Sequence, residues 1–503
     1  MPSLQTLLDQ VDQSAAEIVE LERSLVRIPS VNTGFMPTGN ETAVALYVQD
    51  WLRSEGIESQ LLARDPGRDN IVALYPLVRD DGAGSFDKLR MASGQRQDIA
   101  SPSQAEGSRA GPGRPSPSRG EGSRAGPGQR VKTRLMLMSH LDVVPVEDET
   151  KWTHEPFGAE VAGGRVYGRG ASDCKALLTA QLMAMAVLKR NDVRLSHGLR
   201  LVSGADEEHG GRWGFGWLAD KHPDDLEAEF AVNEGGGVPV KIGNTLTYLL
   251  GTGEKGRLEI HIRLKGESAH ASVPWLGRNA SYTLARALAA IEGYRPELDT
   301  SLPLFDHLGR FGIETKPSPK NIDEVIAETQ KRSPRLATIL RALSRMTLTP
   351  TMVRGGVKSN SVPESITLTC DVRSLPFQDE AYVRGELDSA LAGLEGVEYD
   401  VDYMSVPNQS PFDSELATAI KRAQALAVDR DDIQWVPALS TGFTDSRFTR
   451  DLGIITYGFN GTHPDDDPML QRAHGTDESV GIVSLVSGTK AMLALAHDLC
   501  GGR

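Results

Sequence analysis

Cysteine is scarce in this chain of 503 residues. Its three cysteines, Cys174, Cys370 and Cys500, are too few and too far apart for a disulfide framework or a thiolate zinc site. The N-terminal segment also lacks a basic stretch followed by an apolar one, so we expect no signal peptide. Together these two absences predict a cytoplasmic protein.

Positive charge and long apolar runs are lacking as well. Lys and Arg number 54 against 68 Asp and Glu, and the formal net charge of −14 argues against a nucleic-acid partner. No run approaches the roughly 18 uninterrupted apolar residues that a membrane span needs, so no membrane contact is expected. The length and the ordinary composition are typical of a globular chain of two or three domains.

One segment, residues 81–130, is poor in apolar and aromatic residues. Gly, Pro and Ser supply 23 of its 50 residues, and EGSRAGPG occurs twice within it. Such a stretch buries too little apolar surface to offset the entropy lost on ordering. We therefore predict a disordered insertion between two strands; a basic tether for an acidic partner is the alternative reading of its slight positive charge.

The rest of the chain predicts an α/β fold. TRLMLMSHLDVVP, at 133–145, is a continuous apolar run typical of a strand buried on both faces. Strands at 199–203 and 231–233, with a helix at 175–190, add βαβ alternation and hence a mostly parallel sheet flanked by helices. Further helices are expected at 4–28, 41–55, 279–293, 379–394, 416–428 and 480–499, and further strands at 70–75, 365–373, 397–403 and 454–459.

Residues 254–265 break this pattern, because apolar and polar residues alternate there as in a half-exposed antiparallel strand. We predict that 254–405 form an inserted α+β lid or dimerisation domain. The catalytic domain would then comprise residues 1–253, which include the insertion at 81–130, and residues 406–503.

Five short polar clusters follow apolar runs, where α/β sheets place their sites. They are His140 with Asp142, Asp173, Glu207 with Glu208, Glu234, and His474. Imidazoles and carboxylates suit zinc, and a shared carboxylate would hold two ions about 3.5–4 Å apart. Each cluster alone also fits a structural histidine, a turn residue or a solvated acid, so the set rather than any member indicates a site.

The clusters belong to longer motifs: SHLDVVP, GRGASDCK, DEEHGG, SAHAS, GGVKSNSVPE, GFTDSRF and AHGTDE. In this order they resemble the co-catalytic zinc exopeptidases and amidohydrolases, a family that includes aminoacylase, glutamate carboxypeptidase, acetylornithine deacetylase and succinyl-diaminopimelate desuccinylase. The resemblance runs from about Ile18 to the C-terminus, the insertion excepted. It is strongest to the carboxypeptidase S-like and N-acyl-amino-acid hydrolase branch.

The resemblance implies a site with two Zn²⁺ ions, which Co²⁺ or Mn²⁺ could replace. The metal ligands it implies are His140, Asp173, Glu208, Glu234 and His474. Asp173 would bridge the ions, with His140 and Glu234 completing one coordination shell and Glu208 and His474 the other. The peptide bond after Asp173 would be cis, and Cys174 reads as a small buried residue.

Two carboxylates would serve catalysis rather than metal binding. The resemblance implies that Asp142 accepts a hydrogen bond from the second ring nitrogen of His140, and that Glu207 is the general base. Neighbouring residues in an extended segment point opposite ways, so Glu207 can face a water while Glu208 faces a metal ion.

The lid would add groups for the substrate. The resemblance implies that His270 steadies the oxyanion, often from the partner subunit of a homodimer formed through 254–405. Asn360 and Arg373 match substrate-contacting positions, and an ordinary ion pair on a strand is the alternative for Arg373. Gly442 matches a substrate-binding position, and the family pattern places Thr444, Asp445 and Arg447 in the lining of the site.

These residues favour a metal-dependent hydrolase that cleaves the amide bond of N-acyl amino acids or of short peptides with a free carboxylate. The alternative is a non-catalytic, metal-dependent binding or assembly protein on the same fold. The presence of Glu207 argues against that alternative, since binding alone needs no general base.

Overall fold

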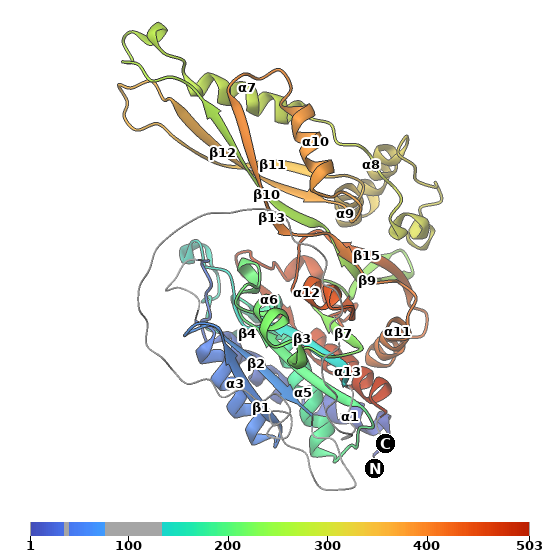
Figure 1. Cartoon of the computed structure of the whole chain (residues 1–503). Coiled ribbons are helices and arrows are strands. Elements are labelled where there is room, and N and C mark those ends of the chain that lie inside the picture. Colours follow the sequence, from blue (N-terminus) through green and yellow to red (C-terminus); the bar gives the residue numbers. More distant parts are fainter. Residues whose placement is uncertain (1, 35–39, 76–132, 502–503) are drawn as a thin grey trace, which may run out of the picture.

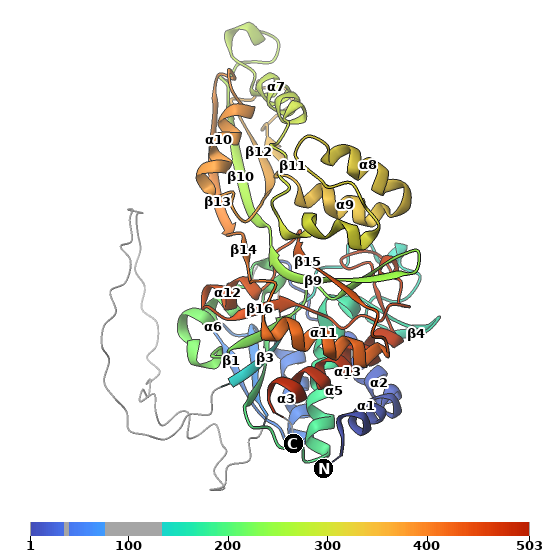
Figure 2. The ribbon, with the colours of Figure 1, turned by 90° about the vertical axis from the view of Figure 1, so that its right-hand side faces the viewer.

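The computed structural model describes residues 2–34, 40–75 and 133–501. The predicted insertion at 81–130 lies outside these residues. The chain forms a large mixed sheet with helices on both faces and a smaller antiparallel sheet that stands at one end of it (Figures 1 and 2). Both termini lie close together at the opposite end.

The large sheet is parallel at its centre and antiparallel at its edges. Its order is β1-β2-β6-β3-β7-β16-β9-β14, and β8 and β15 also pair with β9. The pairings β6–β3, β3–β7, β7–β16 and β9–β15 are parallel and the others antiparallel. The strands are β1 (Glu58–Ala63), β2 (Asp69–Leu74), β3 (Thr133–His140), β6 (Gly198–Gly204), β7 (Phe230–Asn233), β8 (Val238–Ile242), β9 (Thr245–Glu254), β14 (Asn408–Gln409), β15 (Gln434–Ser440) and β16 (Ile455–Gly458).

Helices bury both faces of this sheet, which confirms the predicted fold class. One core holds side chains from α1 (Leu4–Gln13), α2 (Ala15–Val26), α3 (Thr42–Ser54), α5 (Ala176–Arg190), α11 (Glu415–Val428) and α13 (Ile482–Leu499). The other holds α6 (Phe215–Lys221) and α12 (Ser446–Asp451). Along β3, Leu135 and Leu137 enter the first core while Met136 and Met138 enter the second. The strand is apolar throughout because successive side chains point to opposite, equally buried faces.

Among the described residues, two helical stretches are long and apolar enough to cross a membrane, Ala171–Arg190 and Ile482–Leu499. Most of each stretch is buried inside the molecule, 83% of the first and 67% of the second. Both contribute side chains to the same core, where α13 packs on α5. Their hydrophobicity is thus accounted for by burial inside the molecule.

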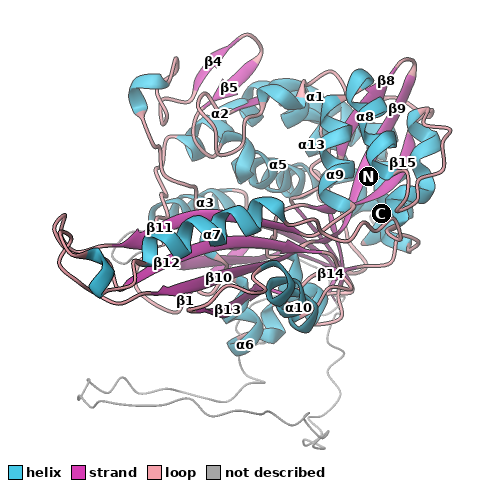
Figure 3. Ribbon diagram, turned by 90° about the horizontal axis from the view of Figure 1, so that it is seen from above, coloured by secondary structure: helices cyan, strands magenta, loops and turns pink. Residues whose placement is uncertain are grey.

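The smaller sheet has the order β11-β12-β10-β13 and is antiparallel throughout. Its strands are β10 (Gly256–Lys265), β11 (Thr347–Gly355), β12 (Ser365–Ser374) and β13 (Val397–Ser405). Helices α7 (Ala280–Gly293) and α10 (Glu380–Ala390) cover one face, as Figure 3 shows. Leu258, Ile260 and Ile262 point into that core while the residues between them stay partly exposed. This burial of one face explains the alternation of apolar and polar residues from which a half-exposed strand was predicted.

The residues between α7 and β11 pack differently from the rest of the predicted lid. η6 (Pro303–Phe311), α8 (Ile322–Arg332) and α9 (Pro334–Leu343) share a core with Val240, Leu249 and Val436 of β8, β9 and β15. This helical block therefore covers an edge of the large sheet. The predicted domain boundaries at 254 and 405 remain predictions. The helical block falls within 254–405 of the sequence, but its side chains pack on the catalytic sheet.

Some local predictions were wrong or incomplete. The expected helix at 4–28 is two helices, because Ser14 leaves the helical conformation with ψ near 8°. The strand expected from residue 254 begins at 256, and Glu254 ends β9. Strands β1, β8, β11 and β15 were not predicted, because short or edge strands carry weak hydrophobic periodicity. Strand β9 was not predicted either, because it is buried along nearly its whole length and so lacks the alternation of a half-exposed strand.

Candidate active site

The five predicted metal ligands converge at the carboxyl ends of the central parallel strands. His140 ends β3, Glu208 follows β6, and Glu234 follows β7. Asp173 lies in the turn before α5, and His474 lies in the loop before β17 (Ser479–Gly481). Strands of parallel orientation end at one edge of a sheet, and this common edge brings together residues that are far apart in sequence.

Distances place Asp173 between the two histidines. Its Oδ1 lies 3.1 Å from Nε2 of His140 and its Oδ2 lies 3.2 Å from Nε2 of His474. Glu234 Oε1 is 3.6 Å from the His140 nitrogen, and Glu208 Oε2 is 3.0 Å from the His474 nitrogen. One carboxylate thus faces two clusters, each completed by one histidine and one glutamate.

The ring of His140 is oriented by its other nitrogen. Nδ1 lies 2.9 Å from the main-chain oxygen of Asp142 and 3.5 Å from the Asp142 carboxylate. A proton on Nδ1 therefore leaves the Nε2 lone pair facing Asp173 and Glu234, as a metal ligand requires. Here the nearer acceptor is the carbonyl rather than the predicted carboxylate.

The carboxylate of Asp142 holds the general-base candidate instead. Its Oδ1 accepts a hydrogen bond from the main-chain N–H of Glu207, and its Oδ2 accepts one from that of Glu208, both at 3.1 Å. Asn32 donates to Oδ2 at 2.8 Å. Asp142 therefore fixes the position of both glutamates through their backbone.

The expectation of an extended segment at Glu207 and Glu208 was wrong. Residues Glu207–His209 form a 3₁₀ turn (η3) that follows Asp206, which has a left-handed backbone at φ 66°. Successive side chains of a 3₁₀ turn are about 120° apart, so the two carboxylates still diverge. Glu208 points to His474, and the side chain of Glu207 is buried.

Sequence reasoning missed the residues that hold this turn. Asp206 accepts hydrogen bonds from the Arg68 guanidinium, from Asn32 Nδ2 at 3.1 Å and from the Trp213 N–H at 3.3 Å. Arg68 is buried and also lies 3.4 Å from the Glu41 carboxylate. The Asp206 of DEEHGG was visible in the sequence, but no periodicity marks its partners Asn32 and Arg68.

Burial and mutual repulsion shift the pKa of the acidic groups at the site. Burial raises the pKa of Glu208 to about 7 and that of Glu234 to about 8, and the nearby Asp173 adds to both shifts. Burial also raises the pKa of Glu207 well above its ordinary value, with Glu234 adding repulsion. Hydrogen bonds that protonated His474 donates to the Asp173 and Glu208 carboxylates raise the pKa of His474 to about 10. The cluster thus favours added positive charge.

The residues present fit a pair of divalent cations. Ligand atoms of His140, Asp173 and Glu208 all lie within 4.8 Å of one another. Glu208 Oε1 is buried and has no hydrogen-bond partner among the described residues, so a lone pair is available there. Imidazole and carboxylate are donors that zinc accepts, and two cations would neutralise the buried carboxylates.

Cys174 lies beside this cluster but is engaged elsewhere. Its sulfur accepts from the His140 N–H at 3.2 Å and lies 3.7 Å from the His140 carbonyl. Burial raises the pKa of the thiol to about 12, so it stays protonated. The thiol fits the structural role predicted for it, and the peptide bond between Asp173 and Cys174 is cis, as predicted.

His270 and Asn360 meet each other at the far end of the lid. The Ala271 N–H donates to the Asn360 carbonyl at 3.0 Å, and His270 forms an isolated β-bridge with Ser361. Both residues are exposed, and His270 Nδ1 lies 2.7 Å from Ser272 Oγ. The ten-residue strand β10 begins next to β9 and ends shortly before His270, a span of about 33 Å.

Arg373 lies at the base of the lid, near the loop after β15. Its Nε donates to Asp371 Oδ1 at 2.8 Å, and Arg257 Nε donates to the other oxygen at 3.1 Å. The Arg257 guanidinium in turn lies 5.5 Å from the ring centroid of Phe443. Arg373 is thus in an ion pair on its strand, as the alternative reading had it, and its cross-strand neighbour Arg257 contacts the predicted substrate loop.

The GFTDSR loop packs around the turn that carries Glu207. Arg447 Nη2 donates to the Gly210 carbonyl at 2.6 Å, and Asp445 is buried against Gly204 and Gly211. Thr444 donates to the buried Glu254 carboxylate. Gly442 is partly exposed, and its N–H donates to Ser440 Oγ at 3.2 Å.

Comparison with known proteins decides the family. The model of peptidase family M20/M25/M40 matches residues 136–498. The chain belongs to this family. The resemblance stated above is thereby confirmed, and membership makes the protein a hydrolase of the metallopeptidase type.

Individual family members are similar over most of their length. The chain is 28% identical to a probable succinyl-diaminopimelate desuccinylase of Staphylococcus aureus, covering 69% of this chain and 78% of that one. It is also 28% identical to the N-fatty-acyl-amino acid synthase/hydrolase PM20D1 of Xenopus tropicalis, over 69% and 68%. The M20 family metallo-carboxypeptidase Sso-CP2 of Sulfolobus solfataricus has the same fold, with a TM-score of 0.63, 18% identity and coverage of 95% and 98%.

Proposed function

We propose that the protein hydrolyses the amide bond of N-acyl amino acids or short peptides that carry a free carboxylate, with two zinc ions in its site. The single observation that carries this proposal is the placement of Asp173 between two histidines, each joined by one glutamate. His140, Asp173 and Glu234 would hold one ion; Asp173, Glu208 and His474 would hold the other. Bound ions of this kind polarise the scissile carbonyl and lower the pKa of water.

The protein's own residues would handle the proton and the substrate. Glu207, a buried carboxylate next to the proposed ligand Glu208, would take a proton from the attacking water and pass it to the leaving amine. Arg373 would bind the substrate carboxylate through the guanidinium donors that Asp371 leaves free. A cytoplasmic location is part of the proposal and is supported by three free, buried cysteines.

Metal analysis paired with an amide-hydrolysis screen tests this function. We expect about two zinc equivalents per chain and cleavage of N-acyl amino acids or dipeptides. A chelator should abolish the cleavage, and zinc, cobalt or manganese should restore it. One ion or none, with no cleavage after the metals are restored, would favour the non-catalytic binding protein instead.

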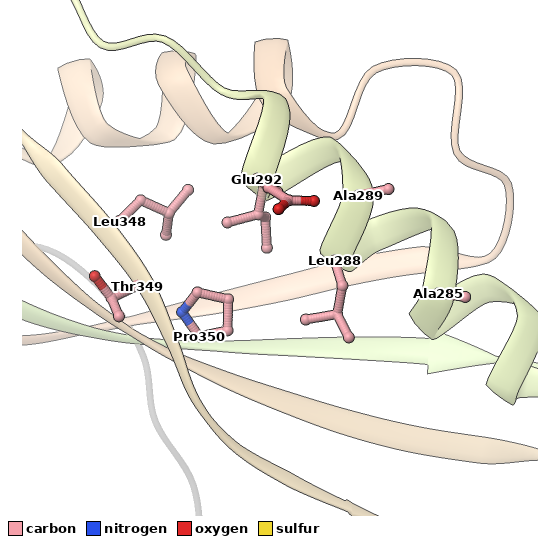
Figure 4. Close-up of a pocket in the computed structure, with 8 residues that line it drawn as sticks. Ala285, Leu288, Ala289, Glu292, Leu348, Thr349 and Pro350 are labelled. Atoms are coloured by element: carbon pink, nitrogen blue, oxygen red, sulfur yellow. The ribbon is translucent and has the colours of Figure 1, made fainter.

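We also propose a homodimer through the lid, because the lid has a strand edge that pairs with no other strand of the described residues, beside an apolar groove. Strand β11 is an edge of the small sheet, and Met352 and Val353 on it are exposed. A cavity of about 560 Å³ lies between β11 and α7, lined by Leu288, Leu348, Pro350 and their neighbours (Figure 4). Pairing of two β11 edges would satisfy the free backbone groups and cover this groove.

The dimer would bring His270 to the partner's metal site, where it would stabilise the oxyanion. We expect His270→Ala to lower kcat with metal content retained. A purified heterodimer of one His270→Ala chain and one Glu207→Gln chain should regain about half of the wild-type activity, because one of its two equivalent sites has both groups intact.

The matched controls are the two homodimers, which should both stay nearly inactive. A heterodimer as inactive as its parents would show that His270 acts in its own chain or does not act at all. Loss of metal from His270→Ala would show that its assignment is wrong.

A further inference from the structure

Glu478, four residues after His474, is a fully buried carboxylate that does not face either metal cluster. Its Oε1 accepts hydrogen bonds from the N–H groups of Ser172 and Asp173, at 2.9 and 3.1 Å, and lies 3.2 Å from Ser172 Oγ. Its Oε2 accepts from the Gly170 N–H at 3.1 Å. One side chain from the His474 segment therefore holds the backbone of the segment that carries the bridging Asp173.

Arg169 completes the connection in the other direction. Its Nη1 donates to Glu478 Oε2 at 2.6 Å, and its Nη2 donates to the main-chain oxygen of His474 at 3.2 Å. The guanidinium is buried and lies 5.3 Å from the ring centroid of Trp152. The planar guanidinium thus spans from the carboxylate to the backbone of the ligand histidine, which a lysine could not do with the same geometry.

The loop that carries His474 has a backbone that needs such support. Arg472, His474 and Asp477 all have positive φ, between 49° and 63°, a backbone region that is strained for residues other than glycine. Beyond the loop, β17 pairs with β5 (Arg165–Tyr167) in register Ser479 to Tyr167. The loop is therefore held at its end by a strand pair and at its centre by Arg169.

These contacts are asymmetric with respect to the two metal clusters. Glu478 and Arg169 bond to the segments of Asp173 and His474, whereas their hydrogen bonds do not include His140 or Glu234. We propose that Glu478 and Arg169 are positioning residues that set the geometry of the subsite formed by Asp173, Glu208 and His474. The inference rests on the proposed function, since it concerns one of its two metal subsites.

A Glu478→Gln variant would preserve the shape of the side chain but disturb its contacts. All five groups around this carboxylate act as donors, and an amide nitrogen is itself a donor. The NH₂ group of the glutamine would thus face other donors, with which it cannot form hydrogen bonds. The backbone of Gly170–Asp173 or the Arg169 contact must then shift, and the bridging carboxylate with it.

Cobalt titration of the metal-free, full-length chain tests the proposal. We expect wild-type protein to bind two Co²⁺ and to show two steps in visible absorbance. In Glu478→Gln the second step, that of the subsite formed by Asp173, Glu208 and His474, should weaken about 10- to 100-fold, the range typical of residues that orient metal ligands. The first step should weaken less, because that subsite shares only Asp173 with the disturbed segments. With both subsites saturated, kcat should fall while KM stays near the wild-type value.

Two further variants separate positioning from general stability. Glu22 is equally buried, and the side chain that donates to it is Thr179 on α5, not a group of either ligand segment. Any effect of Glu22→Gln should therefore be on thermal stability and on neither cobalt step. Arg169→Lys keeps the charge but loses the planar guanidinium, and should weaken the second step less than Glu478→Gln does. Arg169→Lys also tests the proposal if Glu478→Gln fails to fold.

Two results would overturn the inference: cobalt steps in Arg169→Lys and Glu478→Gln that match wild type, or weakening of both steps to the same extent. A wild-type chain that binds fewer than two Co²⁺ would instead contradict the proposed function, so the two failures are distinguishable.

Discussion

A Glu207→Gln variant should bind its metal ions normally and lose nearly all hydrolytic activity. Glutamine keeps the size and buried packing of the side chain but cannot accept a proton from water. General acid–base groups contribute about 10²- to 10⁴-fold to rate, or about 3–5 kcal/mol of transition-state stabilisation. We therefore expect kcat to fall by that factor with metal content unchanged, as measured by steady-state kinetics and metal analysis of the same sample.

The Glu22→Gln variant is the matched control, because it makes the same chemical change at another buried glutamate. It should keep wild-type kcat. If Glu207→Gln retained more than a tenth of the activity, another group would have to be the general base. If Glu207→Gln lost metal, Glu207 would be a metal ligand, and the roles proposed for Glu207 and Glu208 would have to be exchanged.

An Asp173→Asn variant should lose metal as well as activity. The two oxygens of Asp173 face different histidines, and asparagine supplies one oxygen and no charge. Its NH₂ group would point at one of the two imidazole nitrogens and compete with a cation there. Loss of a bridging ligand should lower the metal affinity by more than the roughly 10- to 100-fold that is typical for residues that only orient metal ligands.

The measurement is metal content after dialysis against metal-free buffer, followed by activity at saturating zinc. We expect at most about one ion per chain, since one bridge serves both subsites, and activity that zinc does not restore. Asp148→Asn, on an exposed turn, should retain both ions. Two firmly held ions in Asp173→Asn would show that the carboxylate does not bridge.

The catalytic core was predictable because its signals are local. The apolar run around β3 has the composition of a strand buried on both faces, and every proposed metal ligand directly follows a strand or lies in a motif of its own. Residue types alone indicated an imidazole and carboxylate site. The lid strand at 256–265 was visible through its alternation, whereas β11 and β15 were not.

The supporting contacts were not predictable, because they join residues that share no local pattern. Asn32 and Asp142 are 110 positions apart, and Glu478 lies 305 positions from Asp173. Only the folded chain shows that the Asp142 carboxylate holds the backbone of Glu207, or that the helical block at 303–343 packs on the large sheet. The position of His270 beyond the far end of β10 likewise depends on how the lid strands run.

The sequence by itself determined the fold class, the family motifs and the types of group available for a metal site, because hydrophobic periodicity and residue chemistry are properties of short segments. The tertiary structure decided which groups meet, how Asp173 is placed between His140 and His474, and what holds each segment. Hydrogen bonds and burial depend on partners that come together only when distant strands end at the same edge of one sheet.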